Sequence, residues 1–234
     1  MCIRDRNKSI VFSSQNAADD FKKIYPEHKG RVHILKFASL VPDFDHLDLQ
    51  ELKSKFNIEK KYFIVCNQFW KHKNHKLVLE TIKKLSKSRD DFQVVFTGKW
   101  DNKSTINYFN GLSDFIRKHK IDGYVKILGF IDRREQLKLL DGSIAVIQPS
   151  LFEGWSTVVE DAKAVGKFIL VSNIPLHQEQ INNNCVFFDP KNAQELAEKM
   201  EGTIKASPSK IEANYKENVL KFANDFLEII QADH

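Results

Sequence analysis

Acidic, glycine and hydroxyl residues gather in the segment Pro149–Gly166, which reads P-S-L-F-E-G-W-S-T-V-V-E-D-A-K-A-V-G. A short apolar run, Ile144–Ile147, precedes it and a helical pattern follows, so the segment joins a predicted strand to a predicted helix. The first N–H groups of a helix have no partner within the helix and attract anions. Glu153 and Asp161 flank that helix start and can accept hydrogen bonds from sugar hydroxyls. An anion cradle beside hydroxyl acceptors is what a nucleotide-sugar site needs.

A second group of charged residues follows another apolar run. Tyr62–Cys66 predicts a strand, and the basic sequence K-H-K-N-H-K after it places Lys73 just before a helical pattern. A cation between a strand and a helix is well placed to contact phosphate, although a solvated basic turn has the same pattern. His72 and His75 are three positions apart without a nearby carboxylate or Cys, so the sequence predicts no metal site.

The helix start contains its own capping pattern. Thr157 and Glu160 have the spacing of a capping box, in which hydroxyl and carboxylate each accept a backbone N–H. We therefore expect Glu160 to have this structural role, which leaves Asp161 free for a ligand. A capped helix start also offers fewer N–H groups to phosphate. Trp70 and Trp155 can line such a site, but aromatic residues in these loops more often complete a core.

Composition limits the class of protein. The chain has 234 residues, 42% hydrophobic content and a net charge of +5, which is typical of a globular protein with one large domain. Its lysines are spread over predicted helix faces without a basic, aromatic-rich stripe, so no nucleic-acid partner is expected. No apolar run approaches the ~18 residues of a membrane span. Three separated cysteines indicate a reducing compartment, so we expect a cytoplasmic protein, with a peripheral position at the inner membrane face left open.

Short apolar runs alternate with helical patterns along most of the chain. The runs are continuous, which indicates strands buried on both faces, as in a parallel sheet covered by helices. From Lys61 to about Met200 the pattern predicts an α/β fold, a doubly wound Rossmann-like parallel sheet. The expected strands in this part are Tyr62–Cys66, Gln93–Thr97, Val125–Leu128, Ile144–Ile147, Phe168–Val171 and Val186–Phe188. The expected helices are Lys76–Ser86, Ile106–His119, Arg134–Leu140, Thr157–Val165 and Ala193–Ile204.

The two ends of the chain depart from this alternation. Residues 9–39 show one strand, Val32–Leu35, and one short helix, Ala17–Ile24, which is too little to bury a core. Pro42–Lys60 is polar and charge-rich, as linkers are. Lys210–Gln231 predicts an amphipathic helix with an apolar side. The first six residues, M-C-I-R-D-R, fit no element.

Three stretches together carry a resemblance to a known family. They are S-S-Q-N-A-A-D-D-F, with the following Y-P and V-H-I-L-K-F-A-S; N-Q-F-W-K-H-K-N-H; and E-G-W-S-T-V-V-E-D-A-K-A-V-G-K. The chain resembles the C-terminal, donor-binding half of GT-B retaining glycosyltransferases of family 4, also called glycosyl transferases group 1. The family pattern is E-G-F-G with a second Glu eight positions after the first, where this chain has Asp161.

The resemblance implies a division of the chain into four parts. Residues 1–40 are expected to be a remnant of the N-terminal acceptor domain, and residues 41–60 a linker. Residues 61–206 are expected to form the nucleotide-sugar-binding Rossmann-like domain. Residues 207–234 are expected to form the C-terminal helix that returns to the acceptor domain. The chain would then lack most of the domain that selects the acceptor.

The resemblance also implies roles for single residues. Lys73 would contact the diphosphate, and Asn67 stands where the family usually has an Arg in the same loop. Glu153 would lie near the hydroxyls of the transferred sugar, and Asp161 would accept from the ribose, with a side chain one methylene shorter than Glu. The catalytic residues would be Glu153 and Lys73. The full expected donor site is Asn67, Lys73, Gly129, Phe130, Glu153, Gly154, Ser156, Thr157 and Asp161, with Gly129 and Phe130 contacting the base through main-chain atoms.

The expected activity is transfer of a sugar from a nucleotide diphosphate sugar to an acceptor, with retention of the anomeric configuration. The sequence leaves the base, the sugar and the acceptor open, and the resemblance requires neither a metal nor another cofactor. Two alternatives remain. The chain can be a nucleotide-sugar-binding module without activity of its own, or a GT-B-fold epimerase that acts on the same donor.

Overall fold

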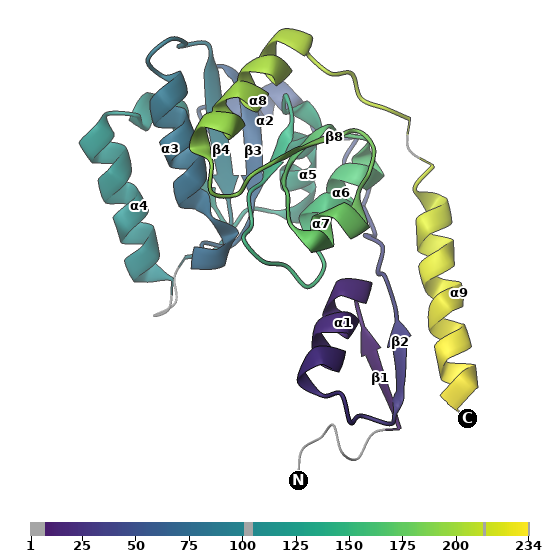
Figure 1. Cartoon of the computed structure of the whole chain (residues 1–234). Helices are drawn as coiled ribbons and strands as arrows, with labels where there is room; N and C mark the ends of the chain where they lie inside the picture. The colour runs from purple at the N-terminus through teal and green to yellow at the C-terminus, as the bar shows by residue number, and fades with distance from the viewer. Residues whose placement is uncertain (1–7, 101–104, 213, 234) are drawn as a thin grey trace.

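The computed structural model describes residues 8–100, 105–212 and 214–233. The first six residues of the chain, including Cys2, lie outside this range. A parallel sheet of six strands forms the centre of the molecule (Figure 1). Its strands are β3 (Lys61–Cys66), β4 (Phe92–Thr97), β5 (Val125–Gly129), β6 (Val146–Gln148), β7 (Ile169–Ser172) and β8 (Cys185–Phe188). All six expected strands of this part are present, within two residues at each end.

The strand order is β5-β4-β3-β6-β7-β8, and every neighbouring pair is parallel. The chain therefore builds the sheet outward from β3 in one direction, then crosses back to β6 and builds in the other. The order reverses between β3 and β6, and in open α/β sheets ligands bind in the crevice at such a point. The predicted doubly wound, Rossmann-like fold is confirmed.

Helices cover both faces of the sheet because successive strand residues face opposite sides. Phe63 and Val65 of β3 lie in one core cluster, whereas Ile64 and Cys66 lie in the other. The first cluster includes side chains of α3 (His75–Leu85), α4 (Ile106–His119) and α8 (Ala193–Ala206). The second includes α2 (Leu49–Lys55), α5 (Arg133–Gly142) and α6 (Thr157–Val165). Two short helical turns, η2 (Lys71–Lys73) and η3 (Asp122–Tyr124), and one short helix, α7 (Pro175–Gln180), complete this part.

The N-terminal residues form a small unit below the sheet in Figure 1. It contains β1 (Ser9–Phe12), α1 (Gln15–Ile24) and β2 (Arg31–Ile34), and the two strands pair in parallel. The expectation of a single strand here is wrong, because the short run S-I-V-F also forms one. Of the residues of α1, Ala18 is buried.

The segment expected as a linker contains a helix. Asp48 caps the start of α2 by accepting hydrogen bonds from two backbone N–H groups. Phe44, Leu52 and Ile58 are buried in the core cluster on that face of the sheet, so the segment packs on the sheet along part of its length. The division of the chain into domains stays a prediction.

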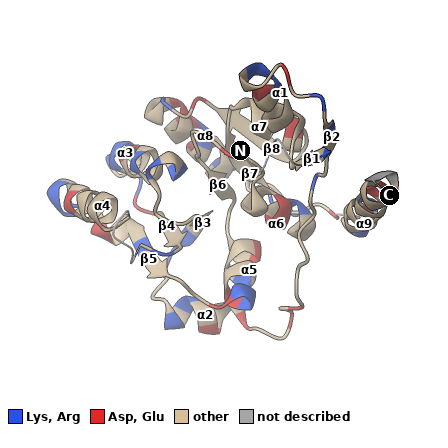
Figure 2. Ribbon diagram, turned by 90° about the horizontal axis from the view of Figure 1, so that it is seen from below, with Lys and Arg blue, Asp and Glu red and all other residues tan. Residues whose placement is uncertain are grey.

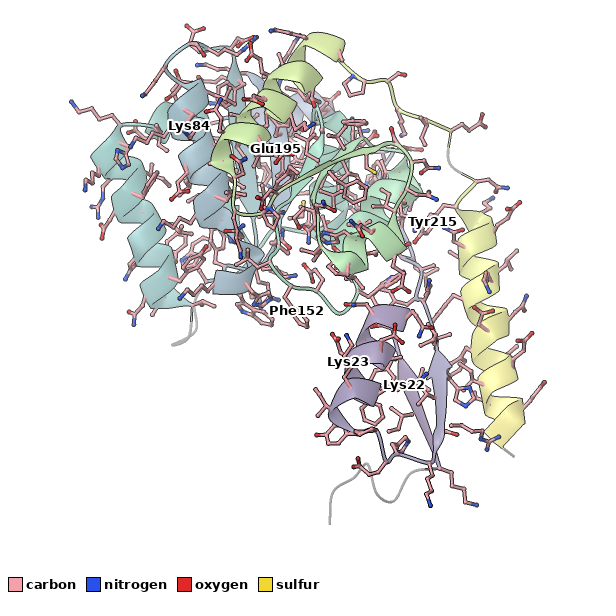
Figure 3. The ribbon with its side chains drawn as sticks, viewed as in Figure 1. Lys22, Lys23, Lys84, Phe152, Glu195 and Tyr215 are labelled. Carbon is pink, nitrogen blue, oxygen red and sulfur yellow. The ribbon has the colours of Figure 1, made fainter. Side chains whose placement is uncertain are left out.

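The C-terminal helix α9 (Lys216–Asp233) is present, as predicted, but it begins six residues later than expected. The preceding residues pass the end of α6, where the Ile211 N–H donates to the Gly166 carbonyl at 3.0 Å. Tyr215, at the start of α9, is buried (Figure 3). The rest of α9 lies beside β2 and has Leu220, Phe226 and Leu227 exposed.

Basic residues are distributed over several helices. Figure 2 shows Lys and Arg on α2, α3, α4 and α5, each of which also carries Asp or Glu. This distribution agrees with the interpretation of the excess charge as solvated helix faces.

Candidate functional site

The carboxyl ends of β3 and β6 meet through two amide side chains. Asn67 follows β3 directly, and its Nδ2 donates to Oε1 of Gln148, the last residue of β6, at 2.8 Å. Both residues are buried. This bond crosses the position where the strand order reverses, so the loops that follow the two strands stand side by side.

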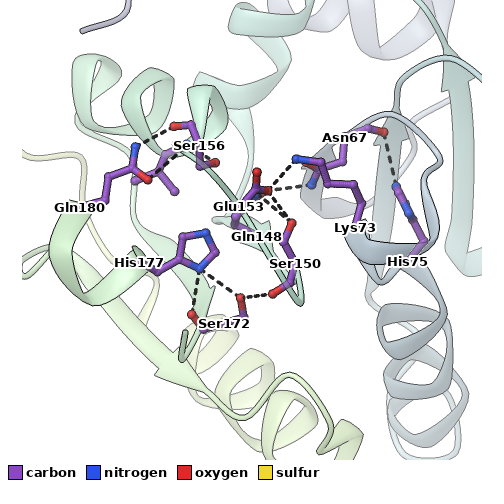
Figure 4. A network of polar contacts seen from close by, with 11 residues as sticks. Asn67, Lys73, His75, Gln148, Ser150, Glu153, Ser156, Ser172, His177 and Gln180 are labelled. Carbon is purple, nitrogen blue, oxygen red and sulfur yellow. Dashed lines mark hydrogen bonds and ion pairs between the residues drawn. The ribbon is translucent and has the colours of Figure 1, made fainter. Parts of the chain in front are cut away.

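Glu153 lies in the loop after β6 and is buried, with 8% of its surface exposed. Its Oε1 accepts three hydrogen bonds, from Lys73 Nζ at 2.6 Å, Ser150 Oγ at 2.7 Å and Gln148 Nε2 at 2.8 Å (Figure 4). Three donors, one of them a cation, compensate the carboxylate for the water it has lost. Lys73 and Glu153, which the sequence predicted to share a site, are therefore in direct contact, and their role toward a donor stays a prediction.

Lys73 is held in place by the turn that contains it. It ends η2, and the next residue, Asn74, has a left-handed backbone with φ 58°. The Asn74 amide Nδ2 donates to the carbonyls of Pro149 at 3.0 Å and Pro190 at 2.8 Å. Asn tolerates this conformation better than most residues, and the two bonds join the loop after β3 to the loops after β6 and β8.

His75 follows this turn and belongs to the core. Its ring stacks on Phe69 with a centroid separation of 4.4 Å, and Nε2 lies 3.4 Å from the Asn67 carbonyl. Burial lowers the pKa of His75 to about 3, so the ring is neutral at physiological pH.

Within the part of the chain that the structure describes, no group of three or more His, Cys, Asp or Glu side chains could hold a metal ion. The expectation of a metal-independent site stays a prediction.

The start of α6 differs from the sequence prediction. Ser156 is the N-cap, and its hydroxyl accepts from the Val159 N–H. The predicted capping box of Thr157 and Glu160 is wrong, because the helix is capped one residue earlier by another hydroxyl. Glu160 instead accepts from Lys163 at 2.9 Å, Gln180 at 2.9 Å and the Tyr215 hydroxyl at 2.5 Å.

Asp161 is also engaged. It is 3% exposed, and its carboxylate accepts hydrogen bonds from Arg133 Nη1 at 2.7 Å, from Arg133 Nη2 and from the Ser39 hydroxyl. The expectation that capping by Glu160 leaves Asp161 free is therefore not met. The role of Asp161 toward ribose stays a prediction.

A cleft of about 300 Å³ opens beside these residues. Six of the nine predicted donor-site residues line it, whereas Gly129, Gly154 and Asp161 do not. Trp70 and Trp155 both line it, so the structure agrees with the first of the two alternatives that the sequence left open for them. The six lining residues are Asn67, Lys73, Phe130, Glu153, Ser156 and Thr157.

One wall of the cleft was missed from the sequence. Thr97, Lys99 and Gln136 line it, and Gln136 Nε2 donates to Thr97 Oγ1 at 2.7 Å. Lys99 Nζ lies 4.5 Å from the centroid of the exposed Phe130 ring. Thr97 ends β4, so its place at the carboxyl end of a strand next to β3 was the available signal.

Gly129 explains how the ends of β4 and β5 come close. Its φ is +74°, and a Cβ atom there would lie 2.9 Å from the Trp100 ring. Its carbonyl accepts from the Gly98 N–H at 2.8 Å. Glycine is required at Gly129 by both conformation and space, and it places Phe130 at the mouth of the cleft.

The parallel sheet flanked by helices, with its C-terminal helix, has the fold of GT-B glycosyltransferases. The sequence profile described as "Glycosyl transferases group 1" matches residues 48–222. The chain belongs to this family, and the resemblance found in the sequence is confirmed.

Curated relatives and solved structures agree with this assignment. The O-antigen biosynthesis glycosyltransferase WclY of Escherichia coli is 26% identical over 192 residues, which are 80% of this chain and 49% of WclY. The O-antigen chain mannosyltransferase RfbU of Salmonella typhimurium is 23% identical over 79% of this chain and 48% of its own length. The chain thus spans about half the length of these relatives.

Among solved structures, a glycosyltransferase from Rickettsia africae ESF-5 matches with a TM-score of 0.81 at 20% identity, over 96% of this chain and 63% of that one. Anabaena Alr3699/HepE, solved in complex with UDP and glucose, matches with a TM-score of 0.78 at 14% identity, also over 96% and 63%. Among the described residues, no helix is both long enough and apolar enough to span a bilayer.

Proposed function

We propose that the cleft binds a nucleoside diphosphate sugar and that the enzyme transfers this sugar with retention of its anomeric configuration. The observation that carries the proposal is the pairing of Lys73 with Glu153 at 2.6 Å, beside the start of α6 and at the reversal of strand order. The pair offers a cation to phosphate and a carboxylate to sugar hydroxyls. The solved relative with UDP and glucose supports this ligand class.

Lys73 can contact Glu153 and a diphosphate at the same time. Its ammonium has three N–H donors, and one is used by Glu153 in the structure. The remaining donors can contact a diphosphate, and the unpaired N–H groups at the start of α6 add to this positive field. As the bond from sugar to phosphate breaks, negative charge grows on the diphosphate, and these groups stabilise it.

The carboxylates of the cleft bear on how retention would be achieved. Among the described residues that line it, Glu153 is the single carboxylate. A double displacement of the glycosidase type uses two carboxylates on either side of the reacting bond. We therefore favour a reaction on one face of the sugar, in which the departing phosphate accepts the proton of the acceptor hydroxyl.

The acceptor and the turnover belong to the proposal as well. The chain spans about half of its curated relatives, and we propose that the acceptor is bound by a part comparable to their other half. The 234-residue chain should then bind the donor while consuming it slowly. Release of nucleoside diphosphate over hours measures this, and rapid sugar transfer by the chain alone would contradict it.

Calorimetric titration with UDP-, GDP- and ADP-sugars tests the donor site. At least one should bind, and Lys73→Ala should weaken diphosphate binding by about ten- to hundredfold while changing nucleoside binding much less. Lys71→Ala is the matched control, because Lys71 is an exposed residue of the same turn that does not line the cleft. Equal effects of the two variants would show that the phosphate site lies elsewhere.

A further inference from the structure

Glu153 lies in an irregular loop, and this loop must be held if the carboxylate is to meet a sugar. The loop, residues 150–156, has no regular secondary structure between β6 and α6. Its tip is exposed, with Leu151 at 42% and Phe152 at 64% (Figure 3). Yet Glu153, the next residue, is buried. Besides the bonds of Glu153 itself, two sets of contacts hold the ends of the loop, at Ser150 and at Ser156.

The first end is held through His177 of α7. The His177 Nδ1 lies 2.9 Å from the Ser172 carbonyl, and because a carbonyl only accepts, Nδ1 carries the proton. The Ser172 hydroxyl donates to the Ser150 carbonyl at 2.6 Å, and Ser150 Oγ donates to Glu153. Figure 4 shows this succession of contacts from His177 to Glu153.

The second end is held through Gln180, at the other end of the same helix. Its side-chain amide pairs with the backbone of Ser156 in both directions. Nε2 donates to the Ser156 carbonyl at 2.8 Å, and Oε1 accepts from the Ser156 N–H at 3.2 Å. Because Ser156 is also the N-cap of α6, this pairing fixes the point where the loop becomes a helix.

α7 itself is anchored on two sides. On one side, Leu176 is buried. On the other side, the Glu179 carboxylate accepts from the backbone N–H groups of Gln15 at 2.9 Å and Asn16 at 3.0 Å, at the start of α1. A short helix with such anchors can hold a neighbouring loop at a defined position.

We propose that His177 and Gln180 are positioning residues that set the place of Glu153 for the donor sugar, acting from α7 on the two ends of loop 150–156. This proposal rests on the function proposed above, because it takes Glu153 to contact the sugar. Neither residue lines the cleft, so their action is through the loop. Both are buried, His177 fully and Gln180 to within 5%, and a buried polar side chain that only filled space would cost stability that an apolar one would not.

Two substitutions of His177 separate its hydrogen bond from its volume. His177→Asn places an amide N–H near the position of Nδ1 and can still donate to the Ser172 carbonyl. His177→Leu fills much of the space without a donor. Gln178→Ala is the control on the same helix, because Gln178 is exposed and bonds to Asn173, outside the loop.

The ligand readout compares a sugar donor with its own diphosphate, for instance UDP-glucose with UDP, or whichever pair the wild-type chain binds. His177→Leu should weaken binding of the sugar donor about tenfold and binding of the nucleoside diphosphate by less than about threefold. His177→Asn and Gln178→Ala should behave as the wild type. Equal losses for both ligands, or an Asn variant as weak as the Leu variant, would overturn the proposal.

A measurement without ligand separates the test of α7 from the test of the proposed function. Hydrogen exchange of residues 150–156 should be faster in His177→Leu than in the wild type and in His177→Asn. If His177→Leu does not fold, Ser172→Ala removes the hydroxyl that reaches Ser150 and should give the same pattern. A wild type that binds no sugar donor would refute the proposed function. Unchanged exchange in the variants would refute the role of α7.

Discussion

Replacing Lys73 by Met removes the cation from a buried ion pair and keeps most of the side-chain volume. The pair is short, at 2.6 Å, and its side chains are 16% and 7% exposed. Removing one partner of a fully buried pair costs about 3–5 kcal/mol, whereas a solvent-exposed pair is worth about 0–1 kcal/mol. Glu153 keeps its bonds from Gln148 and Ser150, and the cleft admits water. We therefore expect Lys73→Met to lower the free energy of unfolding by about 2 kcal/mol.

Urea unfolding followed by circular dichroism measures this difference. Lys23→Met is the matched control, because Lys23 pairs with Asp20 through side chains that are 74% and 51% exposed. It should change the free energy of unfolding by less than about 0.5 kcal/mol.

A double-mutant cycle tests the cause. In the variant Lys73→Met/Glu153→Gln no buried charge is left unpaired, so the two losses should not add, and the coupling energy should be about 1 kcal/mol or more. The reasoning is refuted if Lys73→Met costs no more than Lys23→Met, or if the two substitutions are additive.

Three further predictions follow from other parts of the molecule. Self-association at high concentration is expected through α9, because it exposes the apolar side chains of Leu220, Phe226, Leu227 and Ile230. Analytical ultracentrifugation should show weaker self-association for Phe226→Lys than for the wild type, and a monodisperse wild type would contradict the prediction. Tyr215→Phe leaves the buried Glu160 carboxylate and the Ser39 N–H without the hydroxyl that they share. Urea unfolding should show the free energy of unfolding lowered by about 1–3 kcal/mol, and a change of less than ~0.5 kcal/mol would contradict this. Burial lowers the pKa of His75 to about 3, so His75 stays neutral in the folded protein at pH values where it is protonated in the unfolded chain, below about 6.5. The free energy of unfolding is therefore highest above that pH and decreases as the pH falls toward 3. Between pH 7 and 5 the wild type should lose about 2 kcal/mol more than His75→Phe, and equal losses would contradict this.

The sheet was predictable because its strands are buried on both faces. The strand β3 has five of its six residues buried, and its Tyr62–Cys66 appears in the sequence as a continuous apolar run that needs no knowledge of its neighbours. The positions of Lys73 and Glu153 followed from the same logic, because both come after a strand whose end could be recognised.

Features that depend on distant partners were not predictable in this way. Asp161 is bonded to Arg133 and Ser39, which are 28 and 122 positions away, and no local pattern announces such an ion pair. The exact start of α6 was ambiguous because Ser156 and Thr157 both carry a hydroxyl that can cap a helix.

The helix α7 was missed because it has no apolar periodicity. Its sequence is P-L-H-Q-E-Q, with Leu176 as its one buried apolar side chain. Pro at the first helical position was the available signal. The polar residues that hold it are bonded to β7, α6 and α1, which the sequence alone does not bring together.

A crystal structure of this chain with the nucleoside diphosphate sugar that it binds tests the central claim most directly. The account predicts the diphosphate within hydrogen-bond distance of Lys73 Nζ and the start of α6, the sugar hydroxyls at Glu153 and the base beside Gly129 and Phe130. A ligand bound outside this cleft, for instance in the pocket between β2, α7 and α9 that Lys36, Glu179 and Asn218 line, would contradict it.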